Sequence, residues 1–468
     1  MRHASSHLVR HTRRALAVVS AAVLALTAAP NWAWSQNGPP PQVRAAVKSI
    51  EDMLTSAGDG PLQAFAAERL TPEFRASFRG DSLLRHLRAI RSAVGDVGGV
   101  MLRRDAGDLV MEIEGGHRSA LRFALDSAFK ITKLQLANDA LPAPAVSPWA
   151  GVTWENFQAK AGEAAAAGFS GVVLARRNGA ELFRGAMGAA DPASRRPTAL
   201  NTVYCIGSQP IDFTITGVML LGQQGKLKLD DPITRFFPGA PADKRPITIR
   251  QLLTGGSGLI DFFGSDSLDW DPDLSWITRD EAVRRIMATK LRFAPGTAKL
   301  HAHAAFVLLA AVIERASGQP YREFIRKELL TPLKMNRTGF YGESLGLTVA
   351  DFAVGSGPSM IGLPNIPPNW GPTSWLVMGS GGMVSTLDDM AAYYEAIDRG
   401  TLLTGEWARW QQGARSGSGG SDRGYFIHRV SDGKGNSILF LTNVAKITQN
   451  APPMERAMDQ LVLGAARP

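Results

Sequence analysis

The stretch "FVLLAAVIERASGQPYREFIRKELLTPLKMNRTGF" (306–340) decides the fold of the larger part of this 468-residue chain. It opens with an apolar run, which predicts a buried helix that ends at Gly318, because glycine readily closes a helix. Its last part, "PLKMNRTGF" (332–340), predicts a loop that packs between secondary-structure elements. The segments on either side of this stretch define the domain that surrounds it.

Two β-hairpins are predicted, one near each end of this domain. "FSGVVLARRNGAELFRGAMG" (169–188) alternates apolar and polar residues around an Asn178-Gly179 tip, a pair typical of tight hairpins. A second hairpin is predicted over 424–443, and a helix with an apolar stripe over 207–227. Strands at both ends with helices between them predict one antiparallel sheet flanked by helices.

The N-terminus is predicted to be an export signal spanning residues 1–35. Arg10, Arg13 and Arg14 lie just before the apolar run 15–29, and small residues follow it, so cleavage after Ser35 is expected. No later stretch is long and apolar enough to cross a bilayer. The protein is therefore expected to be exported, periplasmic or secreted, with no integral span once the signal is removed.

Composition narrows the function further. The chain has a net charge of +9, and four of its arginines lie in the first 36 residues. The rest of the chain is therefore only mildly basic, and no nucleic-acid partner is expected. Cys205 is the only cysteine, which excludes an internal disulfide. We interpret it as a small buried hydrophobic side chain.

The chain is divided into two folded domains. The sequence of residues 36–138 predicts helices followed by four short segments in which apolar and polar residues alternate, so a small α+β domain is expected. Its order of elements is similar to that of the nuclear-transport-factor-2-like group. The proline- and alanine-rich residues 139–151 predict a linker, and 152–468 form the second domain. No catalytic constellation is found in the first domain.

The second domain resembles the serine β-lactamases and penicillin-binding-protein-like esterases, closest to the class C branch. The resemblance rests on strings that keep their order, including "GKLKLDDPITRFFPG" (225–239), "ITIRQLLTGGSGL" (247–259), "FAPGTAKL" (293–300) and "GSGGMVSTLDDMAAY" (379–393). It implies a nucleophilic serine with a lysine three residues later, a Tyr-x-Asn motif, and a Lys-Thr-Gly or His-x-Gly motif on an edge strand.

The first of these motifs has lost its lysine. It stands here as Ser208-Gln209-Pro210-Ile211, and isoleucine can neither accept a proton nor supply a positive charge. A serine hydroxyl without an activating base is a poor nucleophile. The structural alternative makes Ser208 a helix N-cap, with Pro210 in the first turn.

The second motif aligns with His301-Ala302-His303, so histidines replace both the tyrosine and the asparagine. A histidine near its ordinary pKa could take the Ser208 proton. The alternatives are side chains without a role in an open cleft or, third, a metal site, since an extended His-x-His segment points both rings to one side. No carboxylate is placed nearby by sequence, and no metal or other cofactor is expected.

The third motif is placed at Ser418-Gly419-Gly420, where it lacks the cation of the family, although Arg415 could replace it after a short shift. The glycines could keep a backbone oxyanion hole, or form only a flexible loop. His428, on the following strand, receives no role.

These departures predict an exported, catalytically impaired relative of the family that binds a peptidoglycan-type peptide or a protein partner. The alternative is an active esterase-type hydrolase, with Ser208 as nucleophile and His301 or His303 as base. A small ester would then be the substrate.

Overall fold

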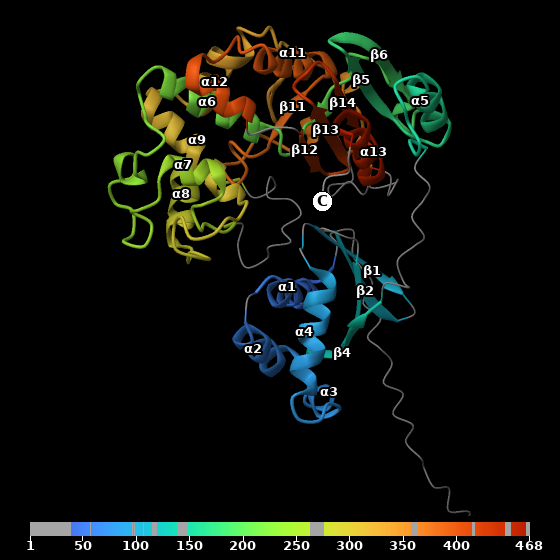
Figure 1. Ribbon diagram of the computed structural model, residues 1–468, viewed down its shortest axis with the longest axis vertical. Helices are drawn as coiled ribbons and strands as arrows, with labels where there is room; N and C mark the ends of the chain where they lie inside the picture. Colours follow the sequence, from blue (N-terminus) through green and yellow to red (C-terminus); the bar gives the residue numbers. More distant parts are fainter. Residues whose placement is uncertain are drawn as a thin grey trace, which may run out of the picture.

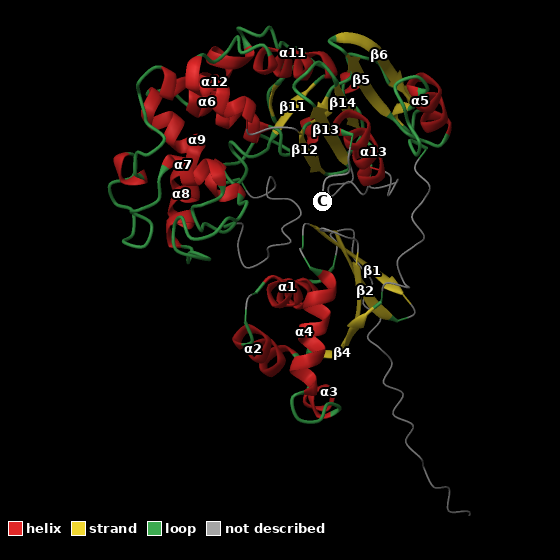
Figure 2. Cartoon of the chain, viewed as in Figure 1, coloured by secondary structure: helices red, strands yellow, loops and turns green. Residues whose placement is uncertain are grey.

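The computed structural model describes residues 39–464, except for 57, 96, 98, 106, 115–118, 138–147, 263–275, 357–363, 414–416 and 445–450. Its course is shown in Figure 1, and its helices and strands in Figure 2. The predicted export signal and most of the predicted linker lie outside the described residues. No described helix has the length and apolar character to traverse a bilayer.

The N-terminal unit begins with four helices, which are α1 (Pro41–Thr55), α2 (Gly60–Arg69), α3 (Pro72–Ala76) and α4 (Ser82–Val94). The apolar stripe predicted for the first helix is buried at Val43, Val47, Ile50 and Leu54. A short α3 begins at a Thr71 cap, whose side chain accepts a hydrogen bond from the Phe74 N–H.

An antiparallel sheet completes this unit, in the order β1 (Gly99–Asp105), β2 (Asp108–Glu114), β3 (Ser119–Leu125) and β4 (Ile131–Leu136). Leu109, Met111 and Ile113 alternate along β2 and join the buried residues of α1 and α4 in one core. Helices followed by a four-stranded meander confirm the predicted α+β class. The likeness to the nuclear-transport-factor-2-like group stays a prediction.

The second unit is built on a five-stranded antiparallel sheet, in the order β12-β13-β14-β5-β6. The strands are β5 (Gly171–Arg177), β6 (Ala180–Met187), β12 (Gly417–Asp422), β13 (Tyr425–Ser431) and β14 (Ser437–Thr442). Asn178 and Gly179 both have positive φ, which is the turn geometry predicted for this hairpin tip. The first and last strands of the domain, β5 and β14, pair directly.

Helices cover both faces of this sheet because its strands bury side chains on both sides. Val173 of β5 packs in one core with α5 (Phe157–Ala166) and α13 (Ala451–Leu463), whereas Leu174 points into the core on the other face. That second core also holds α6 (Pro210–Gln223), α9 (His303–Ser317) and α11 (Leu387–Asp398). The predicted antiparallel sheet flanked by helices is confirmed.

Shorter elements complete the unit. The helices are α7 (Ile249–Thr254), α8 (Arg279–Ala288), α10 (Tyr321–Ile325) and α12 (Gly405–Gly413). The strands are β7 (Ala189–Asp191), β8 (Arg196–Pro197), β9 (Tyr204–Cys205), β10 (Gly339–Phe340) and β11 (Met383–Ser385). α9 ends at Gly318 in the left-handed conformation, as its sequence predicts.

Candidate active site

Ser208 lies in a tight turn between β9 and α6. Gly207, just before it, has a φ of 51°, a conformation that favours glycine. The residue at the N-cap of α6 is Gln209, and no side chain caps this end of the helix. The predicted capping role of Ser208 is therefore wrong, because the turn places it one residue too early. Pro210 does occupy the first turn, where its missing N–H costs nothing.

Two glycines allow the edge strand β12 to lie against this turn. A Cβ added to Gly420 would lie 2.5 Å from the backbone nitrogen of Ser208, and one added to Gly207 would lie 2.6 Å from that of Ser421. Side chains at either position would therefore collide with backbone. The Ser208 N–H donates to no acceptor among the described residues. It is thus a backbone donor without an acceptor in the described part of the chain, the kind of group that can bind an oxyanion.

The side chain at the lysine position is apolar and buried. Ile211 is 9% exposed and belongs to the core on the α6 side of the sheet. The Ser208 hydroxyl, which is half-buried, makes no hydrogen bond within the described part of the chain. No amine stands on the first turn of α6 to accept or position the serine proton.

A polar network lies behind Ser208, and its centre is Tyr394 on α11. The Tyr394 hydroxyl donates to Gln209 Oε1 and lies 3.3 Å from Asp212 Oδ2. All three side chains are buried. Buried polar groups that satisfy each other hold one geometry, so this network fixes the start of α6 against α11.

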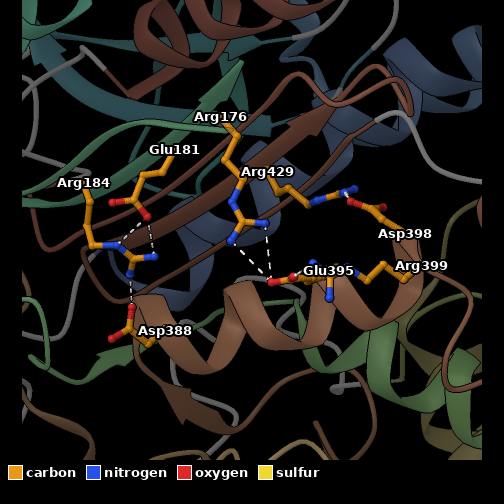
Figure 3. Close-up of polar contacts among 8 residues, drawn as sticks. All are labelled: Arg176, Glu181, Arg184, Asp388, Glu395, Asp398, Arg399 and Arg429. Atoms are coloured by element: carbon orange, nitrogen blue, oxygen red, sulfur yellow. Dashed lines mark hydrogen bonds and ion pairs between the residues drawn. The ribbon is translucent and has the colours of Figure 1, made fainter. Parts of the chain in front are cut away.

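Ion pairs fix α11 to the sheet in turn (Figure 3). Asp388, Glu395 and Asp398 of this helix face arginines from three different strands. These pairs are Arg184–Asp388, Arg176–Glu395 and Arg429–Asp398. The Arg429 guanidinium also lies 4.6 Å from the centre of the Tyr394 ring, a cation–π distance. The sheet, α11 and the serine turn are therefore mechanically connected.

The two predicted histidines lie together at the start of α9. His303 is the first residue of the helix, and Ala302 is its N-cap in an extended conformation. The metal alternative assumed that the whole His-x-His segment is extended, but the helix already begins at His303. The two rings are 5.4 Å apart between centroids and nearly perpendicular.

A carboxylate that the sequence analysis missed approaches this pair. Asp261 Oδ2 lies 3.3 Å from His303 Nδ1, and Asp261 Oδ1 accepts the Ala304 N–H at 3.1 Å. The sequence placed no carboxylate near the histidines, and the fold brings one there. Asp261 is 42 residues away in sequence, and no motif links it to His303. An acidic side chain close to the "GGSG" turn was the only available signal.

The ionisation of these groups follows from their surroundings. His301 is an exposed residue, yet desolvation of its ring lowers its pKa, the neighbouring His303 lowers it further, and Asp261 opposes both effects. Burial raises the pKa of Asp261, but hydrogen bonds from His303 and Ala304 outweigh this and hold it below its ordinary value. A neutral His301 and an ionised Asp261 are thus expected at neutral pH.

The structure brings some of the predicted residues together and separates others. Gly420 contacts the serine turn, whereas Gly419 faces the opposite side of the sheet, towards His428. No hydrogen bond joins Ser208 to His301 or His303 in the described residues. Nothing is described of the Ser418 side chain, and Arg415 lies outside the described residues.

Cys205 lies directly beneath this site but is not part of it. Its side chain is 1% exposed and makes a 2.7 Å contact with the Tyr341 hydroxyl. Burial, followed by the charge of Asp422, raises the pKa of the thiol well above its ordinary value. A protonated, buried thiol is a poor nucleophile, which agrees with the structural interpretation of this residue.

An antiparallel sheet covered by helices, with a serine turn against its edge strand, defines the class of penicillin-binding-protein-like serine hydrolase folds. Residues 156–437 match the family model described as Beta-lactamase. This segment is more than half of the chain, and the chain belongs to the beta-lactamase family.

The curated proteins that match in sequence include three bacterial relatives. "Penicillin-binding protein 4*" of Bacillus subtilis is 34% identical over 38% of this chain and 39% of its own length. "Esterase EstB" of Burkholderia gladioli is 35% identical over 36% of this chain and 46% of its own length. "D-alanyl-D-alanine-carboxypeptidase/endopeptidase AmpH" of Escherichia coli is 29% identical over 37% of this chain and 46% of its own length. The matches thus span less than half the length of these relatives.

Solved structures extend the likeness of the fold. FmtA from Staphylococcus aureus superimposes with a TM-score of 0.55 at 19% identity, over 67% of this chain and 90% of its own. The octameric penicillin-binding protein homologue from Pyrococcus abyssi superimposes with a TM-score of 0.54 at 23% identity, over 67% of this chain and 77% of its own. At these identities the likeness concerns the fold alone.

Proposed function

We propose that this protein is an exported member of the beta-lactamase family that has lost the standard acylation chemistry and binds a ligand in its cleft. The observation that carries the proposal is Ile211, which fills the lysine position with a buried hydrocarbon. Without an amine there, the Ser208 hydroxyl has no group on its own helical turn to take its proton. The name of one relative, a D-alanyl-D-alanine-carboxypeptidase, favours a peptidoglycan-type peptide as the ligand.

The free N–H of Ser208 supports binding without turnover. A backbone N–H that is preorganised beside Gly420 can donate a hydrogen bond to a carbonyl or carboxylate oxygen whether or not the hydroxyl reacts. Peptides that end in D-alanine carry such a carboxylate. Binding then needs the close approach of the serine turn and β12, and not the lost lysine.

A single set of measurements tests this proposal. Purified wild type is treated with a fluorophosphonate probe and assayed with a p-nitrophenyl ester between about pH 7 and 9, where an ordinary histidine is largely neutral. A D-Ala-D-Ala peptide is titrated in parallel. We expect no labelling above the level of Ser208→Ala, together with saturable binding of the peptide by both proteins. Labelling that requires Ser208 would refute the loss of acylation chemistry.

A rewired hydrolase is the second candidate, and the contact between Asp261 and His303 favours it. A carboxylate at Nδ1 orients a histidine so that Nε2 can act as a base, as in a Ser-His-Asp triad. The bond between Ser208 and a histidine would then form only with substrate present, since catalytic hydrogen bonds are often loose without it.

The variants Asp261→Asn and His303→Ala separate the two candidates. In a rewired enzyme both would lower Ser208-dependent labelling, by about 10²-fold or more for the histidine. In a non-catalytic protein neither changes the background. His301→Ala tests the other predicted base, whose ring accepts no hydrogen bond from and donates none to a described carboxylate; a larger loss there than in His303→Ala would make His301 the base.

A further inference from the structure

His428 is the one histidine of the second domain that lies away from the His301-His303 pair. It stands on β13 and is 2% exposed, packed between Phe426 and Phe440 with ring centroids 6.3 and 5.6 Å away. Its neighbour Ile427 points into the core on the α6 side, so His428 points to the face that α13 covers. An imidazole among aromatic rings needs polar partners for both nitrogens.

Both nitrogens of this ring face carboxylates from α13. Nε2 lies 2.8 Å from Asp459 Oδ1, and Nδ1 lies 3.6 Å from Glu455 Oε1. The two acids are four residues apart, so they project from one face of the helix. Ligand atoms of the three residues all lie within 4.8 Å of one another.

The two contacts demand a positive charge between His428 and Glu455. The bond to Asp459 requires a proton on Nε2, since a carboxylate only accepts. In a neutral ring, Nδ1 then carries a lone pair, and no donor within the described residues reaches this buried atom. A lone pair that faces a carboxylate across 3.6 Å is repulsive unless a proton or a metal ion lies between them.

The separation fits a metal ion between the two ligand atoms. A hydrogen bond from Nδ1 would draw the oxygen to about 2.7–3.2 Å, which is closer than observed. Two ligand atoms at about 2.1 Å from a tetrahedral zinc ion would lie about 3.4 Å apart. Gly419 leaves this space open, since a Cβ added there would lie 3.3 Å from Nδ1.

We propose that His428 Nδ1 and Glu455 bind a divalent transition-metal ion of the zinc type, with Asp459 orienting the ring through Nε2. Such carboxylate–histidine–metal arrangements fix the tautomer and strengthen the ligand. Two protein ligands leave the remaining positions to water, so we expect moderate, micromolar affinity. The ion would fasten α13 to the sheet directly behind the Gly419-Gly420 edge of the cleft.

Zinc titration of the full-length protein tests this proposal. Untagged, chelator-treated protein carries His301→Ala and His303→Ala, so that the pair in the cleft does not contribute zinc ligands. Isothermal titration calorimetry with zinc chloride at pH 7 should show one ion per chain. Saturation should raise Tm by several degrees, because an ion that binds only the folded state stabilises it.

Variants at the site should remove this signal in the same background. We expect Glu455→Gln to lose at least 10-fold in zinc affinity, and Asp459→Asn to lose about 10–100-fold, as other partners of metal-bound histidines do. Glu455 has a side chain that is 38% exposed, so its substitution should leave the fold intact even if His428→Gln does not. Glu163→Gln, at an exposed carboxylate of α5, is the matched control and should bind zinc as the parent does.

Two results would overturn the proposal. One is the absence of zinc binding up to about millimolar concentration, in which case the charge between Nδ1 and Glu455 is a proton. The other is equal affinity in the parent and in Glu455→Gln, which would place the zinc elsewhere. Neither result bears on acylation at Ser208.

Discussion

Gly420→Ala is expected to break the contact between the edge strand β12 and the serine turn. A methyl group at this position would lie 2.5 Å from the backbone nitrogen of Ser208 and 3.1 Å from the carbonyl oxygen of Ile206. Ordinary contacts of carbon atoms lie about 1 Å further out. Both obstacles are backbone, so no side chain can rotate away and the strand or the turn must move.

The size of the effect follows from the cost of overpacking. One extra methyl group in a close-packed region that cannot relax costs about 1–3 kcal/mol. For a domain of about 300 residues that corresponds to a fall in Tm of roughly 2–5 °C. The same movement displaces the Ser208 N–H, so ligand binding in the cleft should weaken with stability.

Differential scanning calorimetry of Gly420→Ala beside Gly419→Ala provides the measurement. Gly419 is the matched control on the same strand, since its added methyl group would meet a ring atom of His428 at 3.3 Å and an Ile427 carbonyl at 3.4 Å. These contacts need shifts of only a few tenths of an ångström. An equal or smaller loss of stability in Gly420→Ala would refute the close approach on which the oxyanion argument depends.

Three further predictions concern the surroundings of the site. Because hydrogen bonds from the start of α9 hold the pKa of Asp261 below its ordinary value, its charge stabilises the fold above about pH 4 and this contribution is lost as the pH falls further. Urea titrations between about pH 5 and 3 should therefore show a weaker pH dependence for Asp261→Asn than for wild type. Tyr394→Phe removes the donor to buried Gln209 and should lower the free energy of unfolding by about 1–3 kcal/mol; an unchanged free energy would show that the network does not stabilise the fold. Gly222→Ala would place a Cβ 2.4 Å from an indole ring of α12 and should lower Tm, whereas Gly162→Ala, with open space around it, should not.

Most of the fold could be predicted from local sequence. The Asn178-Gly179 tip and the apolar stripes of the helices each act within a few residues, where backbone preference and periodicity are decisive. The capping role of Ser208 failed because a single residue of shift in the turn moved the N-cap to Gln209. Helix boundaries depend on how a turn meets its neighbours, and sequence alone does not fix them.

Only some residues of the candidate site could be predicted from the sequence. Ser208, His301 and His303 were found because a family pattern marks their positions. Asp261 and Tyr394 were not, since neither belongs to a motif and each meets its partner only after the chain has folded.

The sequence by itself determined the family fold and the replacement of an amine by hydrocarbon at position 211, because both are written in the order and identity of residues. Only the tertiary structure decided which groups meet. Gly420 touches the turn at Ser208, and the carboxylates of α13 meet His428, across long stretches of chain. Such contacts depend on how the sheet and its helices close around one another, and short-range preferences carry no information about that closure.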